Sequence, residues 1–295
     1  MNYSKKGVRA KQKTLNSKSQ KWGRKIALTC VKVMLAAVVG IGICGVAAGI
    51  GVFRGILSST PTIRLSDVVA VGEATIVYDR EGNEIDQYVS TNSNRLSVGM
   101  DEIPDYLGKA FVAIEDERFY QHNGIDFKSI IRAGYQFFKT GGEEAQGAST
   151  ITQQLLKNTV FTDWTSEGNN KIKKIKRKIQ EQYLALEITK YYSKDEILLR
   201  YMNAINLGQN TLGVESASLR YFGKHCSELT ISECAVIASI TQNPSKYNPI
   251  RHPEENVKRR EKCLNKMLEL GFISQTQYDE AMADTDAVYE RIGLY

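Results

Sequence analysis

Three consecutive carboxylates, at Glu115, Asp116 and Glu117, follow directly on an apolar stripe. The stripe has the i, i+3, i+4, i+7 spacing of one helix face and consists of Leu107, Ala110, Phe111 and Ile114. Glu115 lies four residues after Phe111, so it borders the buried side of this helix. A carboxylate at such a border is partly withdrawn from water, which suits it to accept a proton from a reacting hydroxyl. Taken alone, the cluster favours the plainer interpretation, a solvated acidic helix end.

A second chemical segment combines small residues with hydroxyl and amide side chains, in the order Gly147-Ala148-Ser149-Thr150-Ile151-Thr152-Gln153-Gln154-Leu155-Leu156-Lys157-Asn158. Ser-Thr after small residues predicts a loop and a helix N-cap, whose free N–H groups can bind an anion. Two amides and the cation of Lys157 follow within about one further turn. The segment therefore suits a phosphate or a sugar, although Ser/Thr caps before polar helices are common.

A third segment is strongly basic, with six Lys or Arg among residues 171–178 and an acid at Glu181. Its isoleucines predict a helix whose core face carries Ile172, Ile175, Ile179, Tyr183 and Leu186. A second stripe places Arg177 and Glu181 at i and i+4, where they pair. This pair is either an ordinary surface ion pair or part of a basic wall for a pyrophosphate.

In this order the segments resemble the peptidoglycan glycosyltransferases of glycosyltransferase family 51, the transglycosylase domains of class A penicillin-binding proteins and monofunctional transglycosylases. The first two family motifs match Glu115-Asp116-x-x-Phe119-x-x-His122-x-Gly124 and Gly147-x-Ser149-Thr150-x-x-Gln153-Gln154-x-x-Lys157-Asn158. The third and fourth match Arg177-Lys178-x-x-Glu181 and Lys194-x-x-Ile197-Leu198-x-x-Tyr201-x-Asn203. The likeness covers roughly residues 75–285 and includes Gly213, Tyr221-Phe222-Gly223-Lys224, Gln242-Asn243-Pro244 and Tyr247-Asn248-Pro249.

The resemblance implies a mostly α, lysozyme-like, two-lobed glycosyltransferase domain with a small β element, preceded by one transmembrane helix. It implies polymerisation of lipid II into β-1,4 glycan strands, with inversion and release of undecaprenyl pyrophosphate. A divalent cation, Mg or Mn, is expected, and no organic cofactor. The implied partners are lipid II, the growing lipid-linked glycan, the membrane, and transpeptidases and other cell-wall synthesis proteins, but no nucleic acid.

By the same match Glu115 would be the general base, and Glu181 would orient the reaction centre or help to hold the cation on the pyrophosphate. The expected substrate-binding residues are Asp116, Ser149, Thr150, Gln153, Gln154, Lys157, Asn158, Lys173 and Arg177. Asp116 is expected to support the local geometry rather than to act as the base. His122 is expected to be structural, because only three His occur in the chain and no Ser/Asp pattern accompanies it.

Two departures from the family pattern stand out. Asn158 and Glu181 are 23 positions apart, longer than expected for the family, which predicts a larger jaw loop at 159–170. One family Arg before the third motif is replaced by a Lys, with Lys173 the nearest candidate for that phosphate contact.

Other functions compete with this interpretation. A lysozyme-like hydrolase could use a glutamate to protonate a glycosidic oxygen, but it has no diphosphate leaving group for a basic wall to neutralise. An inactive membrane-anchored cell-wall scaffold would not need Glu115 and Glu181. A nucleic-acid binder would need its basic tail away from a membrane helix. No Ser-x-x-Lys occurs, so no transpeptidase activity is expected in these residues.

The elements that position these residues are mostly helical. One helix is predicted to begin near Pro104-Asp105, and another to open with the capping box of Ser193-Lys194-Asp195-Glu196. Before them, the strands 74–78 and 84–89 flank Asp79-Arg80-Glu81-Gly82-Asn83, which is typical of a hairpin turn.

The N-terminal part has the composition of a membrane anchor. Ten of the 39 Lys and Arg fall in residues 1–32, which have no acidic residue, so the rest of the chain is mildly acidic, with 29 basic against 33 acidic residues. The 21 uncharged residues from Val33 to Phe53 would span roughly 30 Å as a helix, the thickness of a bilayer core. The positive-inside bias predicts a cytoplasmic N-terminus. A cleaved signal peptide and a buried soluble helix are the alternatives.

These patterns predict five regions along the chain. They are a basic cytoplasmic tail (1–32), a signal-anchor helix (33–53), a stalk with the β element (54–98), the transglycosylase domain (99–285) and a C-terminal tail (286–295). The expected location is the bacterial cytoplasmic membrane, crossed once, with the catalytic domain extracytoplasmic.

Overall fold

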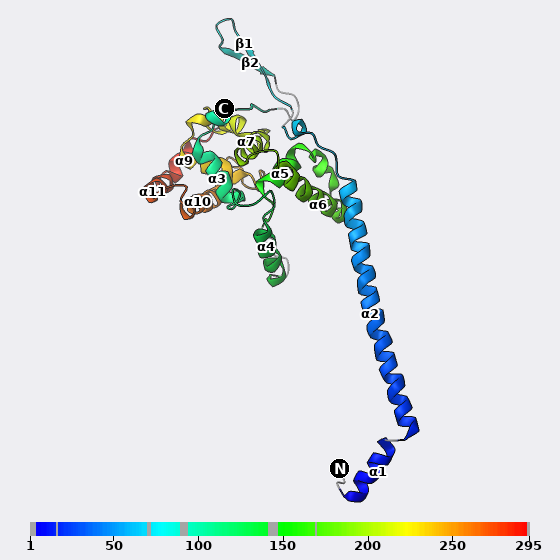
Figure 1. Ribbon diagram of the computed structural model, residues 1–295. Coiled ribbons are helices and arrows are strands. Elements are labelled where there is room, and N and C mark those ends of the chain that lie inside the picture. The colour runs from blue at the N-terminus through cyan, green and yellow to red at the C-terminus, as the bar shows by residue number, and fades with distance from the viewer. Residues whose placement is uncertain are drawn as a thin grey trace. The chain divides into compact units, whose positions relative to one another are not determined.

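The computed structural model describes residues 4–15, 17–69, 72–88, 94–140, 147–168 and 170–293. The chain divides into two compact units, residues 1–60 and 61–295. In chain order the elements (Figure 1) are α1 Lys5–Leu15, α2 Lys18–Ser58, η1 Leu65–Asp67, β1 Thr75–Tyr78, β2 Glu84–Tyr88, η2 Met100–Glu102, α3 Asp105–Glu115, α4 Phe127–Lys139, α5 Ile151–Thr159, η3 Thr162–Glu167, α6 Lys171–Ile188, α7 Lys194–Ala204, α8 Val214–Phe222, η4 Cys226–Glu228, α9 Ile231–Ile240, α10 Pro253–Glu269, α11 Gln275–Ala283 and α12 Thr285–Glu290.

The first unit contains the apolar helix predicted from the sequence. α2 runs for 41 residues without interruption. Its stretch Lys21–Ser58 is long and apolar enough to cross a membrane by length and composition, and an 18-residue window within it has a mean hydropathy of 2.5. The helix extends beyond the predicted 33–53 span at both ends, from Lys18 to Ser58.

The second unit confirms the mostly α fold with a small β element. Within the described residues, β1 and β2 form one antiparallel hairpin in which Thr75 pairs with Tyr88. The carboxylate of Asp79 closes the turn by accepting the N–H groups of Glu81 at 2.9 Å and Asn83 at 2.7 Å. Val89, predicted to end the second strand, lies outside the described residues.

The core of this unit is built around α9, whose residues from Ser232 to Ile240 are all buried. α9 packs against both α3 and α10 (Figure 1). α5 packs against α6 and α7, and the rings of Phe111 on α3 and Tyr201 on α7 meet edge to face at 5.7 Å. This packing brings the C-terminal end of α3 close to the N-terminal end of α5.

The loop after α3 is tied tightly to α5 and α6. Gly124 has φ +89°, and a Cβ there would lie 2.3 Å from the carbonyl oxygen of Ala185 on α6, so only glycine fits. The carbonyl of Gly124 in turn accepts the hydroxyl of Thr150 at 2.7 Å. The acidic cluster and the small-residue segment are thereby held in one place.

The predicted core face of α6 is wrong. Of the predicted face, Ile172, Ile175, Tyr183 and Leu186 are exposed and Ile179 is half-buried. The stripe of Arg177, Glu181, Leu184 and Ile188 is buried instead. The charged stripe can be buried because its ions pair with one another, which offsets their loss of hydration. The apolar stripe is interleaved with lysines and lies outside the core.

Candidate active site

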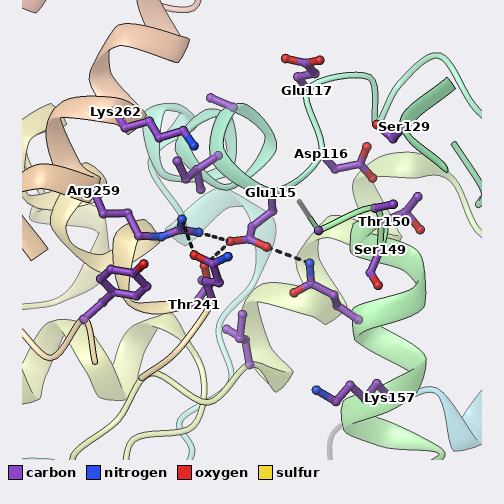
Figure 2. Close-up of a pocket in the computed structure, with 18 of the residues that line it drawn as sticks. Glu115, Asp116, Glu117, Ser129, Ser149, Thr150, Lys157, Thr241, Arg259 and Lys262 are labelled. Atoms are coloured by element: carbon purple, nitrogen blue, oxygen red, sulfur yellow. Dashed lines mark hydrogen bonds and ion pairs between the residues drawn. The ribbon is translucent and has the colours of Figure 1, made fainter. Parts of the chain in front are cut away.

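The predicted chemical residues converge on a cavity of about 870 Å³. Its walls come from the end of α3, the start of α5, α6, the segment after α9, and α10. Of the predicted site residues it is lined by Glu115, Asp116, Ser149, Thr150, Gln154, Lys157 and Asn158. Figure 2 shows Glu115 between Arg259 and Thr241 on one side and Ser149, Thr150 and Lys157 on the other.

Glu115 receives three donors from three different parts of the fold. Its Oε1 accepts Arg259 Nη2 at 2.7 Å and Thr241 Oγ1 at 2.5 Å, and its Oε2 accepts the amide of Gln154 at 2.9 Å. The side chain is 11% exposed. Both oxygens therefore accept hydrogen bonds, and the arrangement holds a carboxyl group in a fixed position at the edge of the cavity.

The amide of Gln154 is itself held in place. Tyr201 donates its hydroxyl to Gln154 Oε1 at 3.2 Å, which turns the NH₂ group toward Glu115. Burial of Tyr201, followed by the nearby charge of Glu115, raises its pKa well above the usual value. The phenol therefore stays protonated and remains a donor.

Asp116 has an internal role in this fold. Its Oδ2 accepts the backbone N–H of Ile151 at 3.0 Å, and its two oxygens lie 2.9 and 3.0 Å from His122 Nε2. The residue is 7% exposed. Asp116 thus joins the end of α3 to the first N–H of α5, with His122 as its second partner.

The start of α5 is capped as the sequence predicts. Thr150 is the N-cap, and its hydroxyl accepts the N–H of Gln153 at 3.2 Å while Gln153 Oε1 accepts the N–H of Thr150. Gln153 is buried in this capping box and does not line the cavity. Ser149 stays available at the cavity wall and accepts Lys178 Nζ at 3.0 Å.

The predicted pair of Arg177 and Glu181 is confirmed, and it is buried. Glu181 Oε1 accepts from Arg177, its Oε2 accepts Lys178 Nζ at 2.7 Å, and its side chain is fully buried. Glu181 therefore aligns two cations, of which Lys178 lines the cavity. Lys173, the expected replacement for a family Arg, is exposed on α6 and is not among the residues that line the cavity.

The segment η3, part of the longer 159–170 loop, contacts the same cations. Glu167 Oε1 accepts Arg177 Nε at 2.8 Å, and the ring of Trp164 lies under Lys157 Nζ, 3.6 Å from the ring centroid. Burial, and then the charges of Lys178 and Arg177, lower the pKa of Lys157. An anionic group and an aromatic ring of the chain thus occupy the cationic side of the site.

Sequence reasoning missed several of these residues. Thr241 and Arg259 contact Glu115 across 126 and 144 residues of chain, and an arginine on a polar helix carries no local signal of such a contact. Glu167 and Trp164 lie in the 159–170 loop, for which the sequence predicts only a larger size. Lys178 does carry a signal, because it stands three residues before Glu181.

The described residues do not fit a metal ion held by protein ligands. They contain no group of three or more His, Cys, Asp or Glu placed to hold one. Both oxygens of Glu181, the residue expected to assist a cation, are taken by Arg177 and Lys178. Positive charge at this site comes from side chains of the chain itself.

Comparison with known proteins shows the family of this chain. The family model described as Transglycosylase matches residues 81–268, and the chain belongs to this family. It carries a glycosyltransferase domain of the kind found in penicillin-binding proteins.

Two relatives illustrate the match. Penicillin-binding protein 1A of Clostridium perfringens is 41% identical over 259 residues, which is 84% of this chain and 37% of the relative. Penicillin-binding protein 1A of Aquifex aeolicus is 38% identical over 250 residues, which is 82% of this chain and 32% of the relative. The chain thus spans about a third of the length of these curated relatives. A crystal structure of Penicillin-Binding Protein 1A from Haemophilus influenzae aligns with 24% identity and a TM-score of 0.37, covering 72% of this chain and 21% of that chain.

Proposed function

We propose that this chain polymerises lipid II into β-1,4 glycan strands, with inversion at the anomeric carbon and release of undecaprenyl pyrophosphate. The observation that carries the proposal is the placement of the Glu115 carboxyl group and of the side chains of Lys157 and Lys178 on one cavity. A glycosyl transfer from a diphosphate needs both groups, a base for the attacking hydroxyl and positive charge for the departing oxygens.

In the proposed reaction Glu115 takes the proton from the acceptor sugar 4-hydroxyl. The hydroxyl oxygen then bonds to the anomeric carbon, and the bond from that carbon to the diphosphate oxygen breaks with its electron pair. Lys157, Lys178 and Arg177 stabilise the charge that develops on the diphosphate. A general base of this kind contributes about 10²- to 10⁴-fold to the rate.

We assign Glu181 the task of holding Arg177 and Lys178 in position for the diphosphate, because it pairs with both of them. Ser149, Thr150 and Asn158 would complete the donor side as sugar and phosphate contacts. Gln154 lines the cavity beside Glu115, whereas Gln153 is buried in the capping box of α5 and does not line it. We further predict that a divalent cation accompanies the substrate diphosphate. No step of the proposed reaction is assigned to a metal held by the protein.

A base is favoured over the acid that a lysozyme-like hydrolase would need. General acid catalysis requires a carboxyl that donates a proton to the departing oxygen, whereas both oxygens of Glu115 accept hydrogen bonds from three surrounding donors. The same site therefore supports transfer better than hydrolysis.

The proposed setting is the bacterial cytoplasmic membrane, with α2 crossing once, the N-terminus cytoplasmic and the catalytic domain outside. A polyprenyl-linked substrate stays in the bilayer, so an anchored enzyme meets it there. Transpeptidases and other cell-wall synthesis proteins are the proposed partners, because glycan strands must still be cross-linked.

The test is incubation of the detergent-solubilised chain with labelled lipid II, followed by gel separation of glycan polymer from monomer. We expect polymer from the parent and a loss of at least 100-fold in Glu115→Gln, in keeping with removal of a general base. Glu117→Gln is the matched control, since Glu117 lines the same cavity two residues away and contacts Arg132 and Lys266 instead. Titration with Mg, Mn and a chelator in the same assay tests the cation.

Equal polymer from the parent and Glu115→Gln would move the base elsewhere. Cleavage of preformed glycan without polymer from lipid II would replace the proposal with the hydrolase.

A further inference from the structure

The two oxygens of Glu115 have different surroundings. Oε1 is held twice, by the guanidinium of Arg259 at 2.7 Å and by the hydroxyl of Thr241 at 2.5 Å. Oε2 accepts one neutral donor, the amide of Gln154 at 2.9 Å. Charge-assisted hydrogen bonds are roughly twice as strong as neutral ones, so Oε1 is the more firmly bound oxygen.

Arg259 is itself rigidly placed. Its Nε donates to the carbonyl of Ser239 at 3.1 Å, its Nη1 donates to Gln242 Oε1 at 2.8 Å, and its guanidinium carbon lies 5.1 Å from the ring centre of Tyr247. The side chain is 10% exposed. A guanidinium with this many fixed partners cannot follow Glu115 if the carboxylate moves, so it sets the position of Oε1.

We propose that Arg259 is a positioning residue that fixes Oε1 and leaves Oε2 of Glu115 as the oxygen that accepts the proton. The inference rests on the proposed function and assigns the atom that performs its first step. The acceptor hydroxyl displaces the Gln154 amide from Oε2, its O–H bond breaks as the proton passes to Oε2, and its oxygen attacks the anomeric carbon. Exchange of one neutral hydrogen bond for another costs little, whereas displacement of Arg259 would leave a buried cation unpaired.

A cation beside a base also weakens it as a proton acceptor, which is the opposing effect. Two features nevertheless favour a pairing of Arg259 with Oε1. The side chain of Glu115 is only 11% exposed, so it has little water around it and needs a fixed partner to hold it in place. The pairing through Oε1 also leaves the other oxygen free to form the new O–H bond.

The experiment compares kcat and KM for lipid II polymerisation in four variants of the full chain. For Arg259→Gln we expect kcat to fall about 100-fold with KM within about twofold, because binding surfaces are retained while the base is misplaced. For Thr241→Val we expect a smaller fall in kcat, about tenfold. For Gln154→Met we expect kcat close to that of the parent and a lower KM, because the acceptor no longer has to displace this amide from Oε2.

The fourth variant, Lys262→Gln, is the matched control. It removes a cation from the same helix and the same cavity wall without removing a donor to Glu115, and we expect a loss of less than about threefold. Thermal unfolding is measured for each variant. In Arg259→Ala, added guanidinium should raise kcat by about tenfold or more. An unfolded or loosened protein would not regain activity in this way.

The outcomes separate the two claims. An inactive parent overturns the proposed function, and this inference with it. An active parent with an equally active Arg259→Gln overturns this inference alone, as does a kcat loss in Lys262→Gln that equals the loss in Arg259→Gln. A loss of kcat in Gln154→Met as large as in Arg259→Gln would reverse the assignment of the two oxygens.

Discussion

The carboxylate of Asp116 accepts the backbone N–H of Ile151, 35 residues away in the chain, at 3.0 Å. This bond joins the acidic end of α3 to the first turn of α5, so that Glu115 and Gln154 face one another. His122 stands on the other side of the same carboxylate, 2.9 Å from Oδ1. These two neighbouring acids thus have different roles, because Asp116 accepts a backbone N–H group whereas Glu115 faces the cavity.

We expect Asp116→Asn to lower both stability and activity. The amide replaces one acceptor oxygen with an NH₂ group. Either the N–H of Ile151 then loses its acceptor, or His122 changes tautomer and carries its proton on Nδ1, a buried atom with no hydrogen-bond partner among the described residues. A buried donor left unsatisfied costs about 1–3 kcal/mol, measurable as a lower free energy of unfolding in denaturant. Glu117→Gln is the control, because Glu117 is 25% exposed and its side-chain bonds are to cationic side chains. Equal stability of Asp116→Asn and the parent would contradict this role.

We expect Glu167→Gln to bind diphosphate more tightly. The Glu167 carboxylate accepts Arg177 Nε, so it competes with any diphosphate for that guanidinium. Loss of its charge should lower the dissociation constant for inorganic pyrophosphate by roughly tenfold, the equivalent of about 1.4 kcal/mol. The measurement is the fluorescence of Trp164 in a Trp22→Phe background, since the chain has two Trp. Glu187→Gln is the control on α6, where its partner is the exposed Lys190, and weaker binding by Glu167→Gln would contradict the competition.

The lowered pKa of Lys157 predicts proton uptake on binding of diphosphate. Burial and then Lys178 and Arg177 depress it below the usual 10.5, so Lys157 loses its charge at lower pH than an ordinary lysine. Because the unfolded chain holds this proton more tightly, Lys157 destabilises the fold below its folded pKa, and this cost disappears as the pH rises toward 10.5. Bound diphosphate favours the charged form, so binding in mildly alkaline buffer should take up a proton.

Calorimetry of pyrophosphate binding in buffers of different ionisation enthalpy measures that uptake. We expect it to vanish in Lys157→Met and to persist in Lys262→Met, which alters another lysine of the same cavity. Binding with no uptake in the parent would contradict the prediction.

Substitutions of the adjacent residues Arg259 and Arg260 on α10 should have different effects on stability and activity. Arg260 is fully buried and donates to Ser232 Oγ at 2.8 Å and Thr285 Oγ1 at 2.9 Å. Arg260→Ala removes a large buried side chain and leaves these partners unsatisfied, so we expect about 3–5 kcal/mol lower stability. Arg259→Gln should instead change the rate with a smaller effect on stability. Denaturant unfolding of both variants decides, and equal losses of stability would argue against the division.

The predicted orientation can be tested with single cysteines. In a background with Cys30 and Cys44 replaced, Ser59→Cys should react with a membrane-impermeant maleimide on intact cells, whereas Ser4→Cys should react only after lysis. The prediction follows from the basic residues that precede α2. Labelling of Ser4→Cys on intact cells would reverse the orientation.

Much of the local structure was predictable from the sequence. The hairpin of β1 and β2, the start of α3, the cap of Thr150 and the capping box of Ser193 lie where the residues predict them. Each of these features depends on contacts between residues that are close in the chain. Such contacts can be predicted from the types of the neighbouring residues. The buried face of α6 was not predictable in this way, because burial depends on what packs against a helix, and here an ion pair is buried while isoleucines are exposed.

The sequence by itself determined which groups are available for chemistry and how they are spaced along each helix. It placed Arg177 one turn before Glu181 and set Glu115 at the end of an apolar stripe. The tertiary structure alone decided what Glu115 touches, because its partners Thr241 and Arg259 come from segments 126 and 144 residues away. Hydrogen bonds act over about 3 Å, so only the packing of α3 against α9 and α10 could bring these donors within reach.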